Sequence, residues 1–402
     1  MEERRIQFSP PDITQKEIDE VVDTLKSGWI TTGPKTKLFE EEISKYCNSE
    51  KTVCLNSATA AMELVLRLFD VGPGDEVITS AYTYTASASV IVHCGATPVL
   101  VDVKSGEFNI DPKKIEKAIT EKTKVIIPVD IGGMPADYDE IFEIVERNKG
   151  KFNPKKGSYQ EKLGRILVLA DAAHSFGGMY KGKKVGSVAD FTSYSFHAVK
   201  NLTTAEGGAI TWKKNEVFNN EQIYKEFMLL ALHGQNKDAL SKMKAGAWKY
   251  DIAMPGYKCN MTDINAAIGL AQLRRYDSEI LTKKDLINTW YKKYLGDIKG
   301  VILPEFKTED KVSSRHIYAL RLEGATEEKR NEVIQKLAEK GIATNVHFQP
   351  LPLLTAYKNL GFKIEDYPEA YAMYSTEISL PFHDFVSEED IIYIAKCLKE
   401  VL

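Results

Sequence analysis

The sequence lacks several features that would place it in a specialised class of protein. Its five cysteines are scattered and odd in number, with no C-x-x-C pair, so neither a disulfide framework nor a metal site is indicated. The longest apolar runs, such as VIIPV and ILVLA, are far shorter than the roughly 20 residues that span a bilayer. The net charge of −4 and the lack of a dense basic run argue against nucleic acid and anionic membranes as partners.

The N-terminus shows no sign of an export signal. The stretch MEERRIQFSPPD carries charges with no apolar segment behind them, whereas a secretory signal needs an apolar core of about seven residues or more. The unpaired cysteines also favour a reducing compartment. We therefore expect a cytoplasmic protein.

The composition and length are those of a globular protein with two domains. The chain has 402 residues, of which 43% are hydrophobic and 27% charged. Over residues 1–270, short β-rich runs alternate with amphipathic stretches, which predicts a large α/β domain with an N-terminal arm and a mostly parallel sheet. From Arg274 the pattern changes, which predicts a smaller α+β domain over 271–402. The polar segment 149–164, rich in Lys and Gly, is interpreted as a surface insertion.

The expected elements follow from the spacing of apolar residues. In the first domain, strands are predicted over 51–57, 76–80, 95–103, 123–130 and 165–171, and helices over 58–69, 85–94, 111–119 and 136–148. In the second, the pattern predicts helices over 274–295, 326–340 and 387–398 and strands over 316–322 and 341–348.

An acidic residue stands at the end of one predicted strand. In LADAAHSFGG (169–178) the apolar run ends at Asp171, and His174 follows among small residues. Carboxyl ends of parallel strands border the crevice where such sheets bind ligands. Asp171 is therefore a candidate site residue, with a turn or cap aspartate as the alternative.

A lysine stands in a similar position after another β-like run. In DFTSYSFHAVKNLTTAEGGAI (190–210) the run FTSYSF leads to Lys200 within small and apolar residues. A lysine held in a pocket loses its charge more easily and becomes a nucleophile for carbonyl groups. The alternative is an ordinary surface lysine.

Two further segments supply groups that hold a planar anion. NSATAAMEL (56–64) places Ser57 and Thr59 at a helix start, where free N–H groups favour phosphate, although an ordinary helix cap has the same pattern. AYTYTASAS (81–89) places Tyr82 and Tyr84 after a strand. Either ring could stack on a flat ligand, and we expect the other to be a core residue.

Together these groups match the requirements of pyridoxal phosphate. A lysine forms its Schiff base, a carboxylate keeps its pyridine nitrogen protonated, and a helix start binds its phosphate. His and Cys lack the spacing of metal ligands, so no metal is expected. No G-x-G-x-x-G follows a strand, which disfavours a dinucleotide site.

Several segments resemble the DegT/DnrJ/StrS family of sugar aminotransferases, which have pyridoxal phosphate fold type I, as in aspartate aminotransferase. They include SGWITTGPK, LNSATAAMEL, DAAHSFGG, SFHAVKNLTTAEGGA, PGYKCNMTDINAAIGLAQL and GIATNVHF. With the tail SLPFHDFVSEEDI, the similarity covers nearly the whole chain. Within the family, the motifs are most similar to those of UDP-4-amino-4-deoxy-L-arabinose aminotransferases.

The resemblance implies a role for each matching residue. Lys200 would form the Schiff base and move protons, Asp171 would pair with the pyridine nitrogen, and His174 would lie near the ring. Tyr84 matches an aromatic that stacks on the ring. Ser57, Ala58, Thr59 and Ser195 match the phosphate cradle, Asn260 matches an asparagine that reaches the neighbouring subunit's phosphate, and Thr31, Tyr257, Lys258, His316 and His347 match the nucleotide-sugar pocket.

The function implied is transfer of an amino group from L-glutamate to a 4-keto nucleotide sugar, with a UDP-linked sugar as the leading candidate. The product would serve the synthesis of a surface glycan or polysaccharide. A homodimer with shared active sites is also implied. Amination at the 3-keto position of a dTDP-linked or other nucleotide sugar, or of a cyclitol ketone, remains open. Related sugar dehydratases carry a histidine in place of the lysine, so Lys200 disfavours dehydration. A regulatory relative would need a DNA-binding segment, and the sequence has no sign of one.

Overall fold

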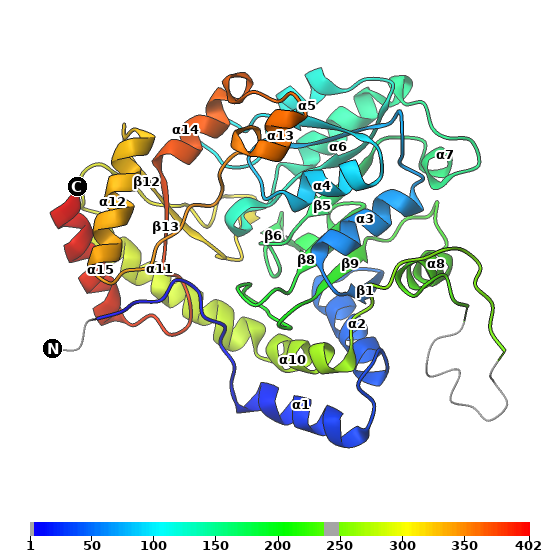
Figure 1. Cartoon of the computed structure of the whole chain (residues 1–402), viewed down its shortest axis with the longest axis horizontal. Coiled ribbons are helices and arrows are strands. Elements are labelled where there is room, and N and C mark those ends of the chain that lie inside the picture. The colour runs from blue at the N-terminus through cyan, green and yellow to red at the C-terminus, as the bar shows by residue number, and fades with distance from the viewer. Residues whose placement is uncertain (1–3, 237–248) are drawn as a thin grey trace.

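A seven-stranded sheet forms the centre of the first part of the chain (Figure 1). The structure, a computed structural model, describes residues 4–236 and 249–402. The strand order is β1–β9–β8–β5–β4–β2–β3, and β9 alone runs antiparallel to its neighbours. The strands are β1 (Lys51–Leu55), β2 (Glu76–Ser80), β3 (Thr97–Val101), β4 (Thr123–Ile127), β5 (Leu167–Asp171), β8 (Phe191–Ser195) and β9 (Gly208–Trp212). The mostly parallel sheet that the sequence predicts is confirmed.

Helices cover both faces of this sheet because its strands are apolar on both sides. In β5, Leu167 and Leu169 pack in one hydrophobic cluster and Val168 and Ala170 in another, as expected for side chains that alternate between faces. The first cluster includes α3 (Ala58–Leu68), α4 (Ala86–His93) and α8 (Asn220–Ala231), and the second includes α5 (Pro112–Ala118) and α6 (Tyr138–Arg147). A third cluster joins α2 (Pro34–Cys47) to α10 (Asp263–Arg274), and α1 (Gln15–Ser27) packs on α10 (Figure 1).

The C-terminal part has an antiparallel sheet and its own hydrophobic cluster. Its strands are β10 (Val301–Ile302), β12 (Tyr318–Leu322) and β13 (Glu377–Leu380), and its helices α11 (Thr282–Leu295), α12 (Glu327–Glu339) and α15 (Glu388–Val401) pack together. Ile6 belongs to the same cluster and forms a parallel bridge with Ile342. The N-terminal arm is therefore anchored to the C-terminal part.

Several elements connect the two parts. Leu351 and Tyr357 pack with Tyr82, next to α13 (Thr355–Asn359) and α14 (Pro368–Thr376). A small sheet pairs β11 (Lys311–Val312) with β6 (Met179–Tyr180), which also pairs with β7 (Lys183–Lys184). No helix in the described ranges has both the length and the apolarity to cross a membrane.

The segment 149–164 is less exposed than the sequence predicts. Its end forms the short helix α7 (Tyr159–Leu163), where Leu163 joins the cluster around α3. The side chain of Gln160 is buried and donates a hydrogen bond to the carbonyl of Phe69 at 2.7 Å. Most of the segment is exposed, and one apolar residue and one buried amide dock its end against the first part of the chain.

Two other expectations differ in the details of the backbone. The long helix predicted from Arg274 is preceded by α10 and begins with a π-helical stretch over Tyr276–Leu281 before α11. The strand predicted over 341–348 is reduced to isolated bridges at Ile342 and Asn345. The residues of this segment alternate as in a strand, but the backbone pairs with other segments only at these two described residues.

The carboxylate of Asp263 caps α2 from another helix. Gly33 precedes α2 and has no side chain to cap it. Asp263, only 1% exposed, accepts hydrogen bonds from the N–H groups of Gly33, Lys35 and Thr36 and from the Thr36 hydroxyl, at 2.7–3.0 Å. Asp263 thus joins α2 to α10 through N–H groups that a helix start cannot satisfy by itself.

We expect Asp263→Ala to lower the free energy of unfolding by about 3 kcal/mol, because buried N–H groups lose a charged acceptor. Urea denaturation measures the change. Asp19→Ala on the exposed side of α1 is the control, with an expected change below about 0.5 kcal/mol. Equal effects of the two substitutions would contradict this role for Asp263.

Candidate active site

A cavity of about 400 Å³ opens at the carboxyl ends of β5 and β8 and at the start of α3. Most of the residues that the sequence singles out lie around it. They are Ser57, Ala58, Thr59, Tyr84, Asp171, His174, Ser195, Lys200, His316 and His347. They come from both parts of the chain, so the folded cavity depends on how the parts pack.

Four predicted residues do not line this cavity. The carboxamide of Asn260 donates to the Thr32 hydroxyl at 2.5 Å and accepts a hydrogen bond from Lys258. Tyr257 and Lys258 are exposed, and so is Thr31. None of the four is among the lining residues of the cavity of its own chain.

Asp171 is the last residue of β5 and is 5% exposed. Its carboxylate accepts hydrogen bonds from the Ser87 hydroxyl at 2.6 Å and from the N–H of Ala173 at 3.2 Å. Burial raises the pKa of Asp171, and these hydrogen bonds oppose the rise. The carboxylate is thus held in place, and its hydrogen bonds offset only part of the cost of burying its charge. It is therefore suited to bind a cationic group of a ligand.

The amine of Lys200 lies in the same cavity, after the end of β8. Burial lowers its pKa to about 8, although the nearby charge of Asp171 acts in the opposite direction. Roughly a tenth of such an amine is neutral at pH 7, far more than of an ordinary lysine, so it can act as a nucleophile and as a base.

His174 is held in one tautomer. The N–H of Gly132 donates to His174 Nδ1 at 3.2 Å, so in the neutral ring the proton must be on Nε2. Burial lowers the pKa of His174 well below its ordinary value, and the charge of Lys200 adds to this effect. His174 therefore offers an N–H donor.

His316 is held in the opposite tautomer by Asn201. The Asn201 amide donates through Nδ2 to the carbonyl of Ser314 at 2.8 Å, which leaves Oδ1 to accept from His316 Nδ1 at 3.2 Å. Nε2 of His316, 3.5 Å from Lys200 Nζ, is then an acceptor. Burial first, and the charge of Lys200 second, lower the pKa of His316, so the ring is neutral.

His347 forms another wall of the cavity. Its Nδ1 lies 2.8 Å from the Ser379 hydroxyl oxygen. Burial lowers the pKa of His347 to about 4, and the charge of Lys200 acts in the same direction. Three neutral imidazoles thus surround one amine, which keeps further positive charge out of the cavity.

The start of α3 lies close against β9. Ser57 caps the helix by accepting from the N–H of Ala60 at 3.0 Å. A Cβ atom on Gly208 would lie 2.3 Å from the carbonyl carbon of Ser57, so only glycine lets β9 approach this closely. The helix cap that the sequence left as an alternative is real, and the capped end also faces the cavity, where its N–H groups favour an anion.

The two tyrosines of AYTYTASAS have different environments. Tyr82 is fully buried, and its hydroxyl donates to the carbonyl of His347 at 2.6 Å. Tyr84 lines the cavity and is 61% exposed. The expectation that one of the two is a core residue is confirmed, and the ring available for stacking is Tyr84.

Sequence reasoning missed three residues that shape the cavity. Ser87 holds Asp171, Asn201 holds His316, and Phe348 stacks against His174 with ring centroids 5.6 Å apart. Asn201 directly follows Lys200 in the sequence, and this position was the signal that could have identified Asn201 as a site residue. The contacts of Ser87 and Phe348 depend on long-range packing that the sequence does not display.

Comparison with known proteins agrees with this geometry. The pattern of the DegT/DnrJ/EryC1/StrS aminotransferase family matches residues 11–399. This chain belongs to that family. The predicted family and aminotransferase activity are confirmed.

Solved structures and curated relatives cover almost the full length of this aminotransferase. The putative sugar aminotransferase Spr1654 from Streptococcus pneumoniae, in its PMP form, is 56% identical with a TM-score of 0.95, over 99% of each chain. It is also known in PLP and apo forms. Protein MJ1066 of Methanocaldococcus jannaschii is 40% identical, and the spore coat polysaccharide biosynthesis protein SpsC of Bacillus subtilis is 37% identical, each over 98% of this chain and 96% of the relative. Fold type I and the pyridoxal phosphate cofactor are confirmed as well.

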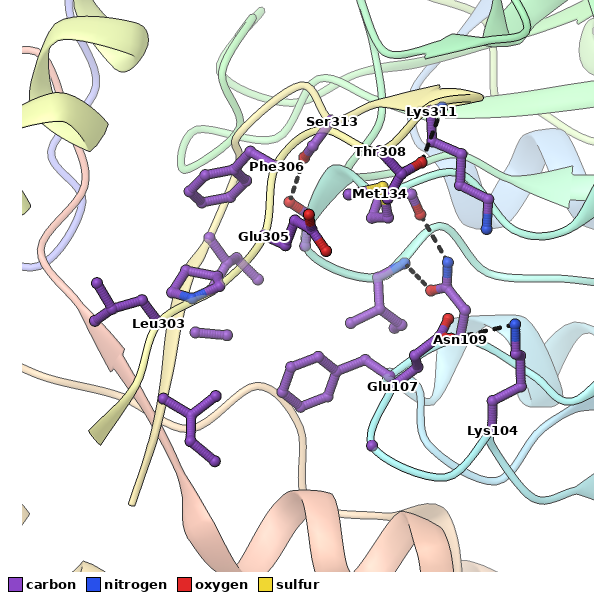
Figure 2. A pocket seen from close by; sticks show the side chains of 18 of the residues that line it. Lys104, Glu107, Asn109, Met134, Leu303, Glu305, Phe306, Thr308, Lys311 and Ser313 are labelled. Atoms are coloured by element: carbon purple, nitrogen blue, oxygen red, sulfur yellow. Dashed lines mark hydrogen bonds and ion pairs between the residues drawn. The ribbon is translucent and has the colours of Figure 1, made fainter. Parts of the chain in front are cut away.

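The aminotransferase has a second, larger cavity of about 590 Å³ (Figure 2). It lies between loops 104–109 and 131–137 on one side and segment 302–321 on the other. Its two lysines both pair with Asp137, Lys104 at 3.0 Å and Lys311 at 2.5 Å. Amines held in ion pairs are charged and are not nucleophiles, so the smaller cavity with Lys200 is the candidate active site.

We expect Asp171→Asn to lower the pKa of Lys200 below its value of about 8, because the charge of Asp171 raises that pKa against the effect of burial. The pH dependence of acetylation of Lys200 in the cofactor-free protein, followed by peptide mass spectrometry, measures the shift. Asp19→Asn on the exposed side of α1 serves as the control. An unchanged or higher pKa in Asp171→Asn would contradict the electrostatic link between these residues.

Proposed function

We propose that this aminotransferase moves an amino group from L-glutamate to the keto carbon of a nucleotide-linked sugar, with C4 of a UDP-linked 4-keto sugar as the first candidate. The product would enter a surface glycan or polysaccharide. The observation that carries the proposal is the meeting of Lys200, Asp171 and the start of α3 in one cavity. The names of the relatives Spr1654 and SpsC support a sugar as the acceptor.

The residues around the cavity fit pyridoxal phosphate. Lys200 is the group that would bind it covalently, and Asp171 would accept a hydrogen bond from its protonated pyridine nitrogen. The start of α3 and Ser195 would hold the phosphate, and Tyr84 offers a ring for stacking. His174 presents an N–H toward the cavity, which suits the oxygen on the cofactor ring. When bound, the cofactor withdraws electrons from the substrate carbon during amino transfer.

Lys200 is also the proposed proton carrier. With a pKa of about 8, roughly a tenth of the free Lys200 amine is neutral at pH 7, far more than of an ordinary lysine. Nε2 of His316, 3.5 Å away, then accepts a hydrogen bond from Nζ and orients its lone pair. Lys200 can thus remove a proton at the substrate carbon and return one there.

The reaction proposed is tested by product analysis. We expect the enzyme, given L-glutamate and a panel of UDP-, GDP- and dTDP-linked 4-keto and 3-keto sugars, to form an amino sugar from one class, detected by mass spectrometry. Lys200→Ala should lower the rate at least about a thousandfold, because it removes both the nucleophile and the base. Full activity in Lys200→Ala would refute the assignment.

The same panel separates the other candidate reactions. If only 3-keto sugars were aminated, the aminated carbon would be C3 and not C4. Reaction with a cyclitol ketone, and with no nucleotide sugar, would change the substrate class. A deoxy-keto product without incorporated nitrogen would identify a dehydratase.

We also propose a homodimer in which Asn260 of one chain serves the active site of the other. Asn260, Tyr257 and Lys258 lie outside the cavity of their own chain, while Tyr84 beside the cavity is widely exposed. The helix α1 presents a further apolar stripe outward, made of Ile18, Val22 and Leu25, which are 38–53% exposed. Exposed apolar surface of this kind is typical of an interface.

Mixed dimers test the shared site. We expect Lys200→Ala and Asn260→Ala each to be strongly impaired as homodimers. After the two are mixed and allowed to exchange subunits, activity should rise to about a quarter of wild type, because half of the sites in the hybrid dimers carry neither substitution. If Asn260 served its own chain, mixing would restore nothing.

The proposed setting is the cytoplasm. All five cysteines are free and buried, including Cys259 beside Asn260. Unpaired thiols are usual in a reducing compartment.

A further inference from the structure

A buried chain of polar groups runs behind His347. Its Nδ1 lies 2.8 Å from Ser379 Oγ, which in turn donates to Glu377 Oε1 at 2.5 Å. The other carboxylate oxygen, Oε2, accepts the backbone N–H of His347 at 2.9 Å. Glu377 and Ser379 are neighbours on one face of β13, and both are fully buried. Among the described residues, the hydrogen bonds of the Glu377 carboxyl group and of Ser379 lead to His347, which lines the cavity.

Glu377 has an unusual position for an acid. Among the described residues it takes part in no ion pair. Arg330 of α12 is the nearest compensating charge, but its guanidinium donates to the backbone carbonyls of Tyr374 and Glu377 at 2.7 and 2.8 Å. Burial raises the pKa of Glu377 to about 8, and the hydrogen bonds from Ser379 and His347 oppose the rise. The carboxyl can thus gain or lose a proton within the working range of an enzyme.

None of the other titratable groups near these hydrogen bonds can take the place of Glu377 as the acid linked to Ser379. Arg321 stands opposite Glu377 on β12, and its guanidinium donates to the sulfur of Met373 at 3.3 Å. Tyr82 donates to the carbonyl of His347, and Tyr374 to Glu327. On the cavity side, the charged group that faces His347 is Lys200.

The hydrogen bonds have two consistent arrangements. When Glu377 is ionised it can only accept, so Ser379 donates to Glu377 and accepts from Nδ1–H of His347, and Nε2 of His347 is a bare acceptor. When Glu377 is protonated it donates to Ser379, and Ser379 donates to Nδ1. His347 then carries its proton on Nε2 and is a donor.

We propose that Glu377 and Ser379 form a proton relay that sets whether His347 offers the cavity a hydrogen-bond acceptor or a donor. Glu377 and Ser379 act as positioning residues, and His347 is the group that meets the substrate. The proposal extends the aminotransferase reaction to residues outside the cavity.

The relay balances one proton. A proton that binds Nε2 of His347 is matched by transfer of the Nδ1 proton to Ser379 Oγ, and of the Ser379 hydroxyl proton to Glu377. The carboxylate becomes a carboxylic acid, and the imidazole stays neutral throughout. This route avoids an imidazolium, which burial disfavours at His347. An amino donor that arrives as an ammonium ion must lose a proton before its nitrogen can attack, and the ionised relay can take it.

The test is the tautomer of His347 in the full-length holoenzyme. With ¹⁵N-labelled histidine, and His347 assigned by its loss in His347→Asn, we expect Nε2–H below the titration of Glu377 and Nδ1–H above it. Glu377→Gln should fix Nε2–H at every pH. Its amide oxygen still accepts from the backbone N–H, and its NH₂ then donates to Ser379 as a protonated acid does. Ser379→Ala should remove the pH dependence because the link between the two groups is cut.

A kinetic readout accompanies the spectrum. Above the titration of Glu377, we expect Glu377→Gln to slow the half-reaction with the amino donor on the order of tenfold, because His347 can no longer accept a proton. At pH values below the titration of Glu377, the variant and the wild type should have equal rates in this half-reaction. A structural role alone would change both limbs of the pH profile equally.

Glu63→Gln is the matched control. Glu63 contacts His93 Nδ1 directly at 3.1 Å, and neither residue lines the cavity. It should change the signal of His93 and leave that of His347 untouched. A single His347 tautomer on both sides of the titration in the wild type, or wild-type behaviour in Glu377→Gln, would overturn the proposal.

Discussion

The active site depends on keeping one amine poorly solvated beside one buried carboxylate. Lys200 must be neutral often enough to act as a nucleophile, and Asp171 must stay able to hold a cationic nitrogen. Burial moves both pKa values toward the neutral forms, while the attraction between the two charges opposes it. The surrounding histidines fit this balance because burial keeps each of them neutral. A charged imidazole here would lower the pKa of Lys200 further and repel a cationic amino donor.

Much of the fold and the centre of the site could be predicted from the sequence. Strands of a parallel sheet are apolar on both faces, so their ends are visible as the points where polar residues begin. Asp171 follows such a run directly, and Lys200 and Ser57 stand just beyond two others. Because parallel strands end at the same edge, these residues had to converge. The motifs that resemble the family then tied the convergence to pyridoxal phosphate.

The outer parts of the site could not be predicted in the same way. Asn201, Ser379 and Glu377 act through hydrogen bonds to histidines at least thirty positions away in the sequence. Side-chain pairing of this kind leaves no periodic trace in a sequence. The docking of α7 through Gln160 was missed for the same reason, since a lone amide in a polar segment has the pattern of a loop.

The most direct test of the central claim is the visible absorbance of the enzyme with bound pyridoxal phosphate, before and after L-glutamate is added without an acceptor. The account predicts a band from the cofactor bound to Lys200 that disappears as the amino group is taken up, and that a keto sugar then restores. A protein that gains no band with pyridoxal phosphate, or whose band no amino donor changes, would contradict it.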